Sequence, residues 1–405
     1  MIPFSPPRID QKIIDEVVQV LKSGWITTGP RTKMFEKKLA QYTGVSNVLC
    51  LNSATAGLEI MLRWLGVGPG DEVILPAYTY SATANVVMHT GATPILVDVN
   101  DDDFCINLNR IRSAITERTK VIMPVDFAGW PCDYKALYAL VNEKEVKLKF
   151  IPANDIQHKL NRIMILADAA HSLGAITDGV KSASIPDVAV YSFHAVKNLT
   201  TAEGGAIVLN LPAPFDNAAI YNFLCVYTLH GQNKDALAKM QKGNWRYDIV
   251  EAGYKCNMTD INAAMGLIEL ERYDDDTLVK RKHICNLYSQ LLNDDNVFQL
   301  PVMKSDTRET SYHLYPLRVR NITEQQRDDI MKHIFDDDIT VNVHFIPLPM
   351  LSYYRKKNYS ISDYPVTYNN YSREISLPVF YDLTDEQIHQ VVASVKNAVK
   401  KVVEL

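Results

Sequence analysis

The chain has 405 residues, of which 47% are hydrophobic and 22% charged, a composition typical of a globular protein with two or three domains. Its 42 Lys and Arg against 47 Asp and Glu give a net charge of −5, so no basic excess is present to bind nucleic acid. No apolar run approaches the ~20 residues that cross a membrane, and residues 1–7 lack the basic and apolar regions of a signal peptide. The six cysteines include no CxxC pair, which favours free thiols and a cytoplasmic location over disulfides or a zinc site.

In chain order, two helical patterns come first and a strand–helix alternation follows. The first helices are predicted over 10–23 and 31–42, ending at Gly24 and Gly44. Strands are predicted at 47–51, 72–75, 93–97, 120–127, 163–167, 188–192 and 206–209. Helices between them are predicted at 56–65, 81–89, 108–115 and 134–142. Several strands are apolar on both faces, which predicts an α/β fold with a mostly parallel seven-stranded sheet covered on both sides.

The pattern changes near residue 255. One long helix is predicted over about 259–292, and strands at 312–319 and 341–344 then mix with helices at 324–334 and 385–402. We therefore predict a large α/β domain, 1–255, and a smaller C-terminal α+β domain, 256–405, that starts with a long linking helix.

Two further features concern the surface. Residues 143–162 are rich in Lys, Asn and Gln and exceed the usual length of a connection, so they are interpreted as a surface insertion, in the form of a hairpin. The Asp triplets at 101–103, 274–276 and 336–338 are interpreted as solvated turns or helix ends, and no metal site is predicted.

An acidic residue, Asp168, ends the apolar strand in the segment ILADAAHS (165–172). Ligands of open α/β sheets collect at the carboxyl ends of the strands, which favours a functional role. Asp also caps helices at such positions, so a structural role for Asp168 stays open when the segment is taken alone.

Two neighbouring strand ends carry complementary chemistry. Lys197 lies five residues after one strand, in a segment whose only other charged residue is Glu203, and partial burial would make its amine a nucleophile. Small and hydroxyl residues at 52–57 open a helix after another strand, a pattern that suits an anion. An anion cradle, a carboxylate and a lysine at one sheet edge are what pyridoxal phosphate requires for its phosphate, pyridinium nitrogen and aldehyde.

The ordered set of motifs resembles the DegT/DnrJ/StrS-type nucleotide-sugar aminotransferases, which depend on pyridoxal phosphate and have the aspartate aminotransferase fold (fold type I). The resemblance spans nearly the whole chain. Besides the segments around Asp168 and Lys197, it rests on SGWITTGP (23–30), NSATA (52–56), PAYTYSATAN (76–85), GATP (91–94), GYKCNMTD (253–260), HFIPLP (344–349) and SLP (376–378).

The resemblance implies roles at the cofactor. Lys197 would form the Schiff base with pyridoxal phosphate and move the proton, and Asp168 would pair with the pyridinium nitrogen. His171 would lie against the cofactor ring or its 3-hydroxyl, and Tyr80 would stack on the ring. The phosphate would be bound by Ala54, Thr55 and Ser192.

Other implied roles concern the partner subunit and the substrate. Asn257 matches a position that reaches the phosphate from the partner, which implies a homodimer with shared active sites. Five residues would border the sugar-nucleotide site, although simple packing is an equal alternative for them: Trp25, Thr28, His313, His344 and Phe345.

The chain departs from the family pattern at three places. Ala202 replaces the first Gly of a Gly-Glu-Gly-Gly run, which questions the local backbone shape. Residues 255–257 read Lys-Cys-Asn where many relatives have Asn-Tyr-Arg, and Pro349 stands where a His near the sugar is frequent.

The implied reaction moves the amino group of L-glutamate to the keto carbon, C-4, of a UDP-linked 4-keto-6-deoxy sugar, for amino-sugar or polysaccharide biosynthesis. A C-3 keto sugar or an amino-cyclitol is an alternative substrate. Dehydratases of the superfamily replace the lysine with His, and this chain keeps Lys197 beside His194, which favours transamination. A catalytically silent homologue is the last alternative, and the cost of an unliganded Lys and Asp in one site argues against it.

Overall fold

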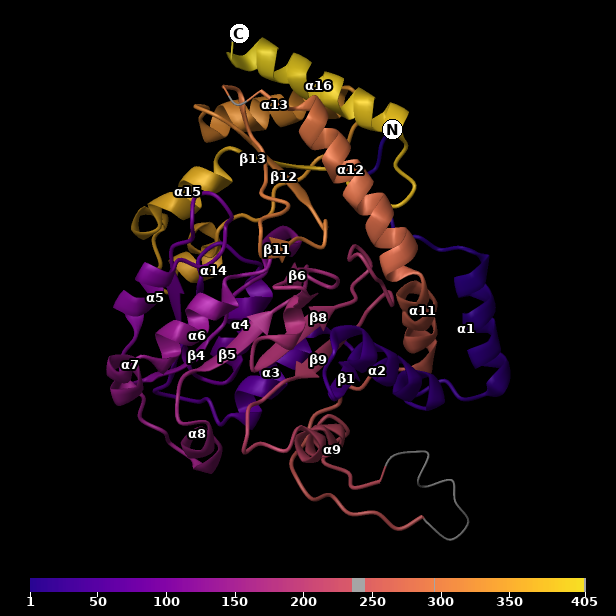
Figure 1. Ribbon diagram of the computed structural model, residues 1–405, viewed down its shortest axis with the longest axis vertical. Coiled ribbons are helices and arrows are strands. Elements are labelled where there is room, and N and C mark those ends of the chain that lie inside the picture. The colour runs from indigo at the N-terminus through magenta and orange to yellow at the C-terminus, as the bar shows by residue number, and fades with distance from the viewer. Residues whose placement is uncertain (235–244, 295, 404–405) are drawn as a thin grey trace.

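The computed structural model describes residues 1–234, 245–294 and 296–403. Its centre is the predicted seven-stranded sheet, and the strand order is β1-β9-β8-β5-β4-β2-β3 (Figure 1). The strands are β1 (Asn47–Leu51), β2 (Glu72–Pro76), β3 (Thr93–Val97), β4 (Thr119–Ile122), β5 (Met164–Asp168), β8 (Val188–Ser192) and β9 (Gly205–Leu209). Only β9 departs from the parallel arrangement of its neighbours, because it pairs antiparallel with both β1 and β8.

Helices cover both faces of this sheet. They are α2 (Pro30–Thr43), α3 (Ala54–Trp64), α4 (Ser81–His89), α5 (Leu108–Ala114), α6 (Tyr134–Asn142), α9 (Asn217–Tyr227) and α11 (Asp260–Glu271). The first helix, α1 (Gln11–Ser23), packs on α11 and not on the sheet. Successive strand residues point to opposite faces, so Leu49 and Leu51 join one core while Val48 and Cys50 join the other. Burial on both faces is the physical reason that the strands read as continuous apolar runs.

The segment between α6 and β5 forms two short helices, α7 (Lys144–Lys149) and α8 (Asp155–Leu160), so the predicted hairpin is wrong. Asn154 caps α8 by accepting a hydrogen bond from the backbone N–H of Gln157 at 3.0 Å. The Gln157 side chain is buried and donates to the carbonyl oxygen of Leu65 at 3.0 Å. The four Lys and two Glu residues of this insertion favour helices and are depleted in strands, which disfavours a hairpin.

The predicted long helix over 259–292 is interrupted. A π-turn at Tyr273–Thr277 separates α11 from α12 (Leu278–Leu291). Tyr273 is fully buried there and donates from its hydroxyl to the carbonyl oxygen of Leu173 at 2.7 Å, while Asp274 pairs with Lys181. These tertiary contacts stabilise the π-turn and its one extra residue, although the sequence pattern alone predicts an unbroken α-helix.

The C-terminal part has its own sheet and core. Its elements are β10 (Phe298–Gln299), β12 (Tyr315–Val319), α13 (Glu324–Asp336), α14 (Ser352–Arg355), α15 (Pro365–Tyr371), β13 (Glu374–Leu377) and α16 (Asp385–Val403), and the sheet order is β10-β12-β13. The strand predicted at 341–344 is wrong, because only an isolated bridge between Asn342 and Ser376 forms there. A third small sheet has the order β11-β6-β7, from Arg308–Glu309, Ile176–Thr177 and Val180–Lys181.

The helices α11 and α12 connect the two cores. Leu267 of α11 packs in a core of the large sheet, and Ile284 of α12 packs in the C-terminal core. Figure 1 shows the two helices running from the large sheet up to α16. The division of the chain at residue 255 stays a prediction.

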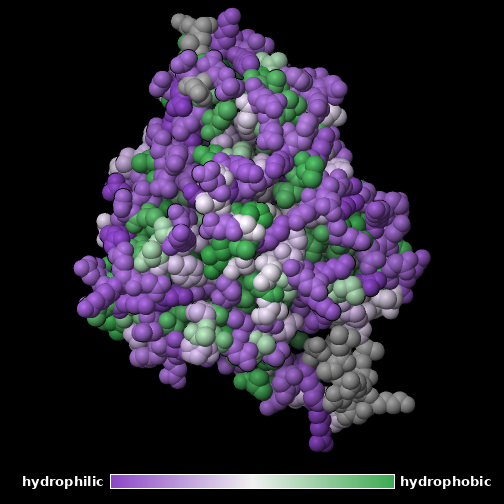
Figure 2. All heavy atoms as spheres, viewed as in Figure 1, coloured by the Kyte–Doolittle hydropathy of each residue, from purple (hydrophilic) through white to green (hydrophobic). Residues whose placement is uncertain are grey.

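The surface is mostly hydrophilic on the face drawn in Figure 2, where apolar residues form separate patches. Among the residues that the structure describes, every helix is too short or too polar to span a bilayer. Within the same ranges, no group of three or more His, Cys, Asp or Glu is placed to hold a metal ion.

Candidate active site

A cavity of about 380 Å³ lies at the carboxyl ends of the central strands. Its floor comes from the ends of β5 and β8 and the start of α3, and the C-terminal part closes it with residues 313–314 and 344–345. Ten of the residues singled out from the sequence line it: Ala54, Thr55, Tyr80, Asp168, His171, Ser192, Lys197, His313, His344 and Phe345. The fold therefore brings together residues that are up to about 290 positions apart in the chain.

Asp168 lies at the end of β5 with its side chain buried. Its Oδ2 accepts a hydrogen bond from Thr83 Oγ1 at 2.8 Å, and its Oδ1 accepts from the backbone N–H of Ala170 at 3.2 Å. A turn follows the strand, so Asp168 caps no helix. Burial raises the pKa of the Asp168 carboxyl, while Thr83, Ala170 and the charge of Lys197 oppose that rise. Among the described residues, no cation forms an ion pair with it.

Lys197 reaches the same cavity from the loop after β8. Burial lowers the pKa of its amine to about 8, against the opposing charge of Asp168. Its Nζ makes no hydrogen bond or ion pair with the described part of the chain. A lysine with this pKa is about one tenth unprotonated at pH 7, far more than an ordinary lysine, and the unprotonated amine is the form that attacks a carbonyl.

The anion cradle is the first turn of α3. Ser53 caps this helix by accepting from the backbone N–H of Ala56 at 3.1 Å, and the N–H groups of Ala54 and Thr55 have no partner within the helix. Gly205 makes the close approach possible, because a Cβ there would lie 2.4 Å from the backbone nitrogen of Ala54. Free N–H groups at a helix N-terminus suit a phosphate.

Two neutral histidines, His171 and His313, contact each other in the wall, with ring centroids 4.3 Å apart and planes tilted by 51°. His171 Nδ1 accepts from the backbone N–H of Ala128 at 3.2 Å, so the proton of the neutral ring is on Nε2. His313 has the opposite tautomer: Asn198 donates from Nδ2 to the Ser311 carbonyl, and its Oδ1 accepts from His313 Nδ1 at 2.8 Å. Burial lowers the pKa of both imidazoles well below their ordinary range.

Aromatic rings form the outer wall of the cavity. Tyr80 is 62% exposed and contacts Phe345, with ring centroids 5.8 Å apart. His344 precedes Phe345 and stacks on Phe4 at 5.4 Å. A ring-shaped ligand entering between Lys197 and Tyr80 would therefore meet an aromatic face.

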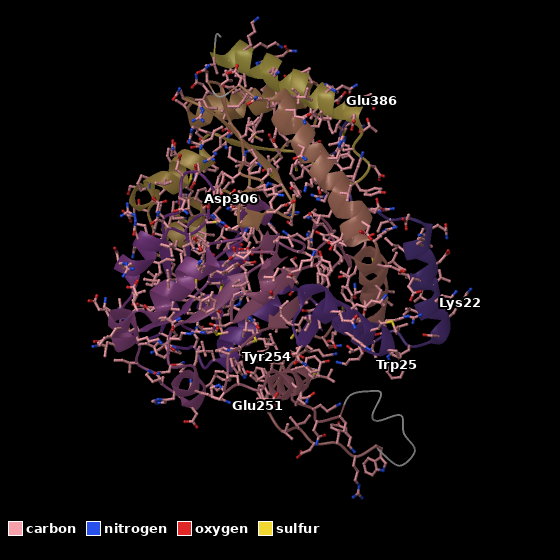
Figure 3. The ribbon with its side chains drawn as sticks, viewed as in Figure 1. Lys22, Trp25, Glu251, Tyr254, Asp306 and Glu386 are labelled. Atoms are coloured by element: carbon pink, nitrogen blue, oxygen red, sulfur yellow. The ribbon has the colours of Figure 1, made fainter. Side chains whose placement is uncertain are left out.

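Three of the residues singled out from the sequence lie outside this cavity: Trp25, Thr28 and Asn257. They form their own group, in which Trp25 Nε1 donates to the Thr28 carbonyl at 3.1 Å and Asn257 Nδ2 donates to Thr28 Oγ1 at 2.5 Å. Asp260 anchors the loop by accepting from the N–H groups of Gly29 and Thr32. Figure 3 places Trp25 at the edge of the molecule, between α1 and α2.

Several cavity residues were missed from the sequence. Phe4 and Ser5 line the wall because a bridge between Ile2 and Ile339 fixes the start of the chain, and no local pattern signals that. Thr83 does not line the cavity but holds Asp168, and its spacing of four from Thr79, whose hydroxyl it contacts at 2.9 Å, is the signal that could have found it.

The departures from the family pattern are visible in the backbone. Ala202 adopts φ 66°, the left-handed region that Gly favours, so the loop keeps its shape without the glycine. The Pro349 side chain is buried beside Leu348 and lies off the cavity wall, so it offers no polar contact there.

Comparisons with known proteins agree with this geometry. The model of the DegT/DnrJ/EryC1/StrS aminotransferase family matches residues 7–396. The spore coat polysaccharide biosynthesis protein SpsC of Bacillus subtilis is 34% identical over 405 residues, covering 98% of this chain and 97% of its own.

Solved structures extend the match to three dimensions. The putative sugar aminotransferase Spr1654 of Streptococcus pneumoniae, in its PMP form, is 44% identical with a TM-score of 0.95, covering 99% of this chain and 100% of its own. Its PLP form has a TM-score of 0.94 at 43% identity, covering 99% of each chain. PseC of Helicobacter pylori, an aminotransferase involved in the biosynthesis of pseudoaminic acid, is 26% identical with a TM-score of 0.85, covering 99% of this chain and 100% of its own.

The residues present fit pyridoxal phosphate, since a buried carboxylate and an amine share one cavity without ion-pair partners and a helix N-terminus faces it. The family and its solved members depend on this cofactor and act on sugars. The chain belongs to the DegT/DnrJ/EryC1/StrS aminotransferase family and is a pyridoxal-phosphate-dependent sugar aminotransferase.

Proposed function

We propose that this enzyme transfers the amino group of L-glutamate to C-4 of a UDP-linked 4-keto-6-deoxy sugar, in the cytoplasm, for the synthesis of an amino sugar of a surface polysaccharide. The similarity to PseC and SpsC supports a sugar substrate of this class. The six cysteines, all free thiols, support a reducing compartment.

The observation that carries the proposal is that the side chains of Asp168 and Lys197 line the same cavity without forming an ion pair. Neither side chain has an ion-pair partner among the described residues, and desolvation of each is costly without a ligand that binds both. A cofactor with a cationic ring nitrogen and an aldehyde satisfies them together.

Each residue then has a defined task. Pyridoxal phosphate, when bound, supplies the electron sink and carries the amino group between the two substrates. Asp168 would hold the ring nitrogen protonated, and Thr83 and the Ala170 N–H keep its carboxylate oriented. Nζ of Lys197, unprotonated, would take the proton from the reacting carbon and return it. His171 would donate from Nε2 toward the 3-hydroxyl.

The phosphate would be bound by the start of α3 and by the Ser192 hydroxyl. Ala54 and Thr55 would donate their backbone N–H groups, and the helix dipole adds to this attraction. Tyr80 would stack on the cofactor ring, and His313, His344 and Phe345 would border the sugar.

We propose that the working enzyme is a homodimer in which Asn257 of one subunit completes the cofactor site of the other. Trp25, Thr28 and Asn257 form a group that does not line the cavity of their own chain, which supports a role at a second subunit. The segment after residue 244 supports an interface too, because its apolar side chains are strongly exposed, with Trp245 at 70% and Val250 at 57%.

The reaction is tested by mixing the purified holoenzyme with L-glutamate and a panel of nucleotide-linked keto sugars. We expect 2-oxoglutarate to be released in step with an amino sugar whose mass and position of amination are read by mass spectrometry and NMR. Lys197→Ala is the control and loses turnover. Amination at C-3, or of a cyclitol ketone, would correct the substrate, and dehydration or no 2-oxoglutarate with any substrate would reject the proposal.

The shared site is tested with hybrid dimers. Lys197→Ala and Asn257→Ala subunits are each impaired alone. In a hybrid of the two, one site combines an intact Lys197 with an intact Asn257, so activity should reappear on mixing. If Asn257 served its own chain, each site of the hybrid would keep one defect and mixing would restore nothing.

A further inference from the structure

A chain of hydrogen bonds runs from a buried carboxyl to the cavity. Glu374 in β13 is fully buried, and its Oε2 accepts from the backbone N–H of His344 at 3.0 Å. Its Oε1 is within hydrogen-bond distance of Ser376 Oγ, which in turn lies 2.9 Å from His344 Nδ1. The far nitrogen of this ring, Nε2, makes no hydrogen bond to the described part of the chain, and His344 lines the cavity.

The Glu374 carboxyl has no ion-pair partner among the described residues. The cations that face it are engaged elsewhere: Arg318 donates to the Asn370 side chain at 2.6 Å, and Arg327 pairs with Asp328 at 2.7 Å. Tyr78, also fully buried, is the other titratable group near it. Burial therefore dominates and raises the pKa of Glu374 to about 8, so the carboxyl is neutral at neutral pH.

A neutral carboxyl has one proton to place. Ser376 Oγ donates to Oε1 when the carboxyl is ionised. In the neutral carboxyl Oε2 still accepts from a backbone N–H, so the proton is on Oε1 and Ser376 Oγ accepts it. The serine hydroxyl then donates its own hydrogen to His344 Nδ1. Burial and the charge of Lys197 lower the pKa of His344 to about 3, so the ring is neutral and its single proton must be on Nε2.

We propose that Glu374 is a positioning residue that acts through Ser376 to fix the tautomer of His344, so that the imidazole presents an Nε2–H donor to the substrate cavity. An ionised carboxyl would reverse the chain: Ser376 would donate to Glu374, His344 would donate from Nδ1, and Nε2 would become an acceptor.

The two tautomers of His344 suit different groups of a substrate. An Nε2–H donor suits the keto oxygen or a hydroxyl oxygen of a sugar, whereas a bare nitrogen would suit only a hydroxyl hydrogen. This part of the inference rests on the proposed sugar substrate and specifies which atoms of it the enzyme reads. The titratable groups that face the His344 ring are Lys197, His171 and His313.

The test is ¹⁵N NMR of the holoenzyme carrying ring-labelled histidine, with the His344 signals assigned from their loss in His344→Gln. Protonated and bare ring nitrogens have well-separated shifts, so the tautomer is read directly. We expect a bare Nδ1 and a protonated Nε2 at neutral pH, and a change to the other tautomer as the pH rises above about 8. A protonated Nδ1 at neutral pH would overturn the proposal.

Two variants separate the relay from simple packing. In Glu374→Gln the carboxamide oxygen can accept from the His344 N–H while its NH₂ donates to Ser376, so the tautomer should stay the same and lose its pH dependence. In Ser376→Ala the relay is cut, and the His344 signals should become those of a mixture. Unchanged signals in Ser376→Ala, or a pH-dependent tautomer in Glu374→Gln, would contradict the relay.

Kinetics complete the test. Ser376→Ala should raise KM for the keto sugar about two- to threefold, because only part of the His344 population then presents the Nε2–H donor, with little change in the glutamate half-reaction. If no keto sugar is aminated, the proposed function fails while the NMR still decides the tautomer. If a sugar is aminated and the tautomer differs, the relay alone fails.

Discussion

At the scale of single residues, Lys197 and Asp168 are held at a cost that a ligand removes. Burial lowers the pKa of the amine and raises that of the carboxyl, while each opposes the shift of the other through its charge. The two groups therefore titrate together: a change in the charge of one shifts the pKa of the other.

The pH dependence of cofactor capture follows. The pKa of Lys197 is lowered from 10.5 to about 8, so the reactive free base is scarce below pH 8 and dominates above it. The rate at which the apoenzyme binds pyridoxal phosphate should rise with pH through a midpoint near 8 and then level off, as followed by absorbance. Asp168→Asn removes the charge that supports the ammonium form, so the midpoint should fall. A midpoint near 10.5 would contradict the burial of the amine.

Ala202 offers a second residue-scale prediction. Its φ of 66° costs an L-residue about 1–2 kcal/mol, and the extra freedom of glycine in the unfolded chain offsets about 0.4–1 kcal/mol of that. Ala202→Gly should therefore raise the free energy of unfolding by about 0.5–1 kcal/mol in urea titrations. Ala206→Gly is the matched control, because Ala206 lies inside β9 and should lose stability. A loss of stability in Ala202→Gly would contradict the strain.

At the scale of elements, β9 and α3 meet at a point with no room for a side chain. A Cβ on Gly205 would lie 2.5 Å from the backbone carbon of Ser53 as well as close to Ala54. Because both contacts are with backbone, the turn itself would have to move, and with it the N–H groups that face the phosphate.

We therefore expect Gly205→Ala to weaken retention of pyridoxal phosphate and to cost about 1–3 kcal/mol of stability. Equilibrium dialysis of the cofactor and thermal unfolding measure the two effects. Gly68→Ala is the control, because a Cβ there meets nothing nearer than the Thr90 carbonyl at 3.9 Å. Normal cofactor affinity in Gly205→Ala would show that the turn does not hold the phosphate.

The central sheet was predictable because each strand is buried on both faces and reads as an apolar run. The strands at 47–51, 93–97 and 188–192 coincide with the predicted ones. The local sequence pattern could not reveal the break at Tyr273–Thr277. The break is stabilised by contacts with distant residues, namely the bond from the Tyr273 hydroxyl to Leu173 and the ion pair of Asp274 with Lys181. The relay through Glu374 was invisible for the same reason, because it joins residues 30 positions apart.

At the scale of the whole molecule, Arg318 ties the C-terminal part to the large sheet. Its guanidinium, fully buried, donates to the backbone carbonyls of Asp101 and Asp102 and lies 4.5 Å over the ring of Phe104. Among the described residues no carboxylate forms an ion pair with Arg318. The contact between the C-terminal part and residues 101–104 therefore depends on these hydrogen bonds.

Arg318→Met keeps most of the side-chain volume and removes those donors, which leaves the carbonyls of Asp101 and Asp102 and the Asn370 side chain without them. We expect a loss of about 3 kcal/mol in the free energy of unfolding and a broader calorimetric transition, because the two parts would unfold less cooperatively. Arg320→Met is the control, on a half-buried arginine that donates only to the Phe298 carbonyl at 3.3 Å. A single sharp transition at the native temperature would contradict the role of Arg318.

The cavity wall has a consequence for redesigning the enzyme. Lys197 is the one Lys or Arg that lines it among the described residues, and in the proposed function that amine binds the cofactor. If the proposed substrate is correct, the wall would contact the sugar ring through neutral donors and aromatic faces, and it would offer the diphosphate of a nucleotide no positive charge. Sugar preference and nucleotide preference should then vary independently, so libraries at the wall would change the first and leave the second intact.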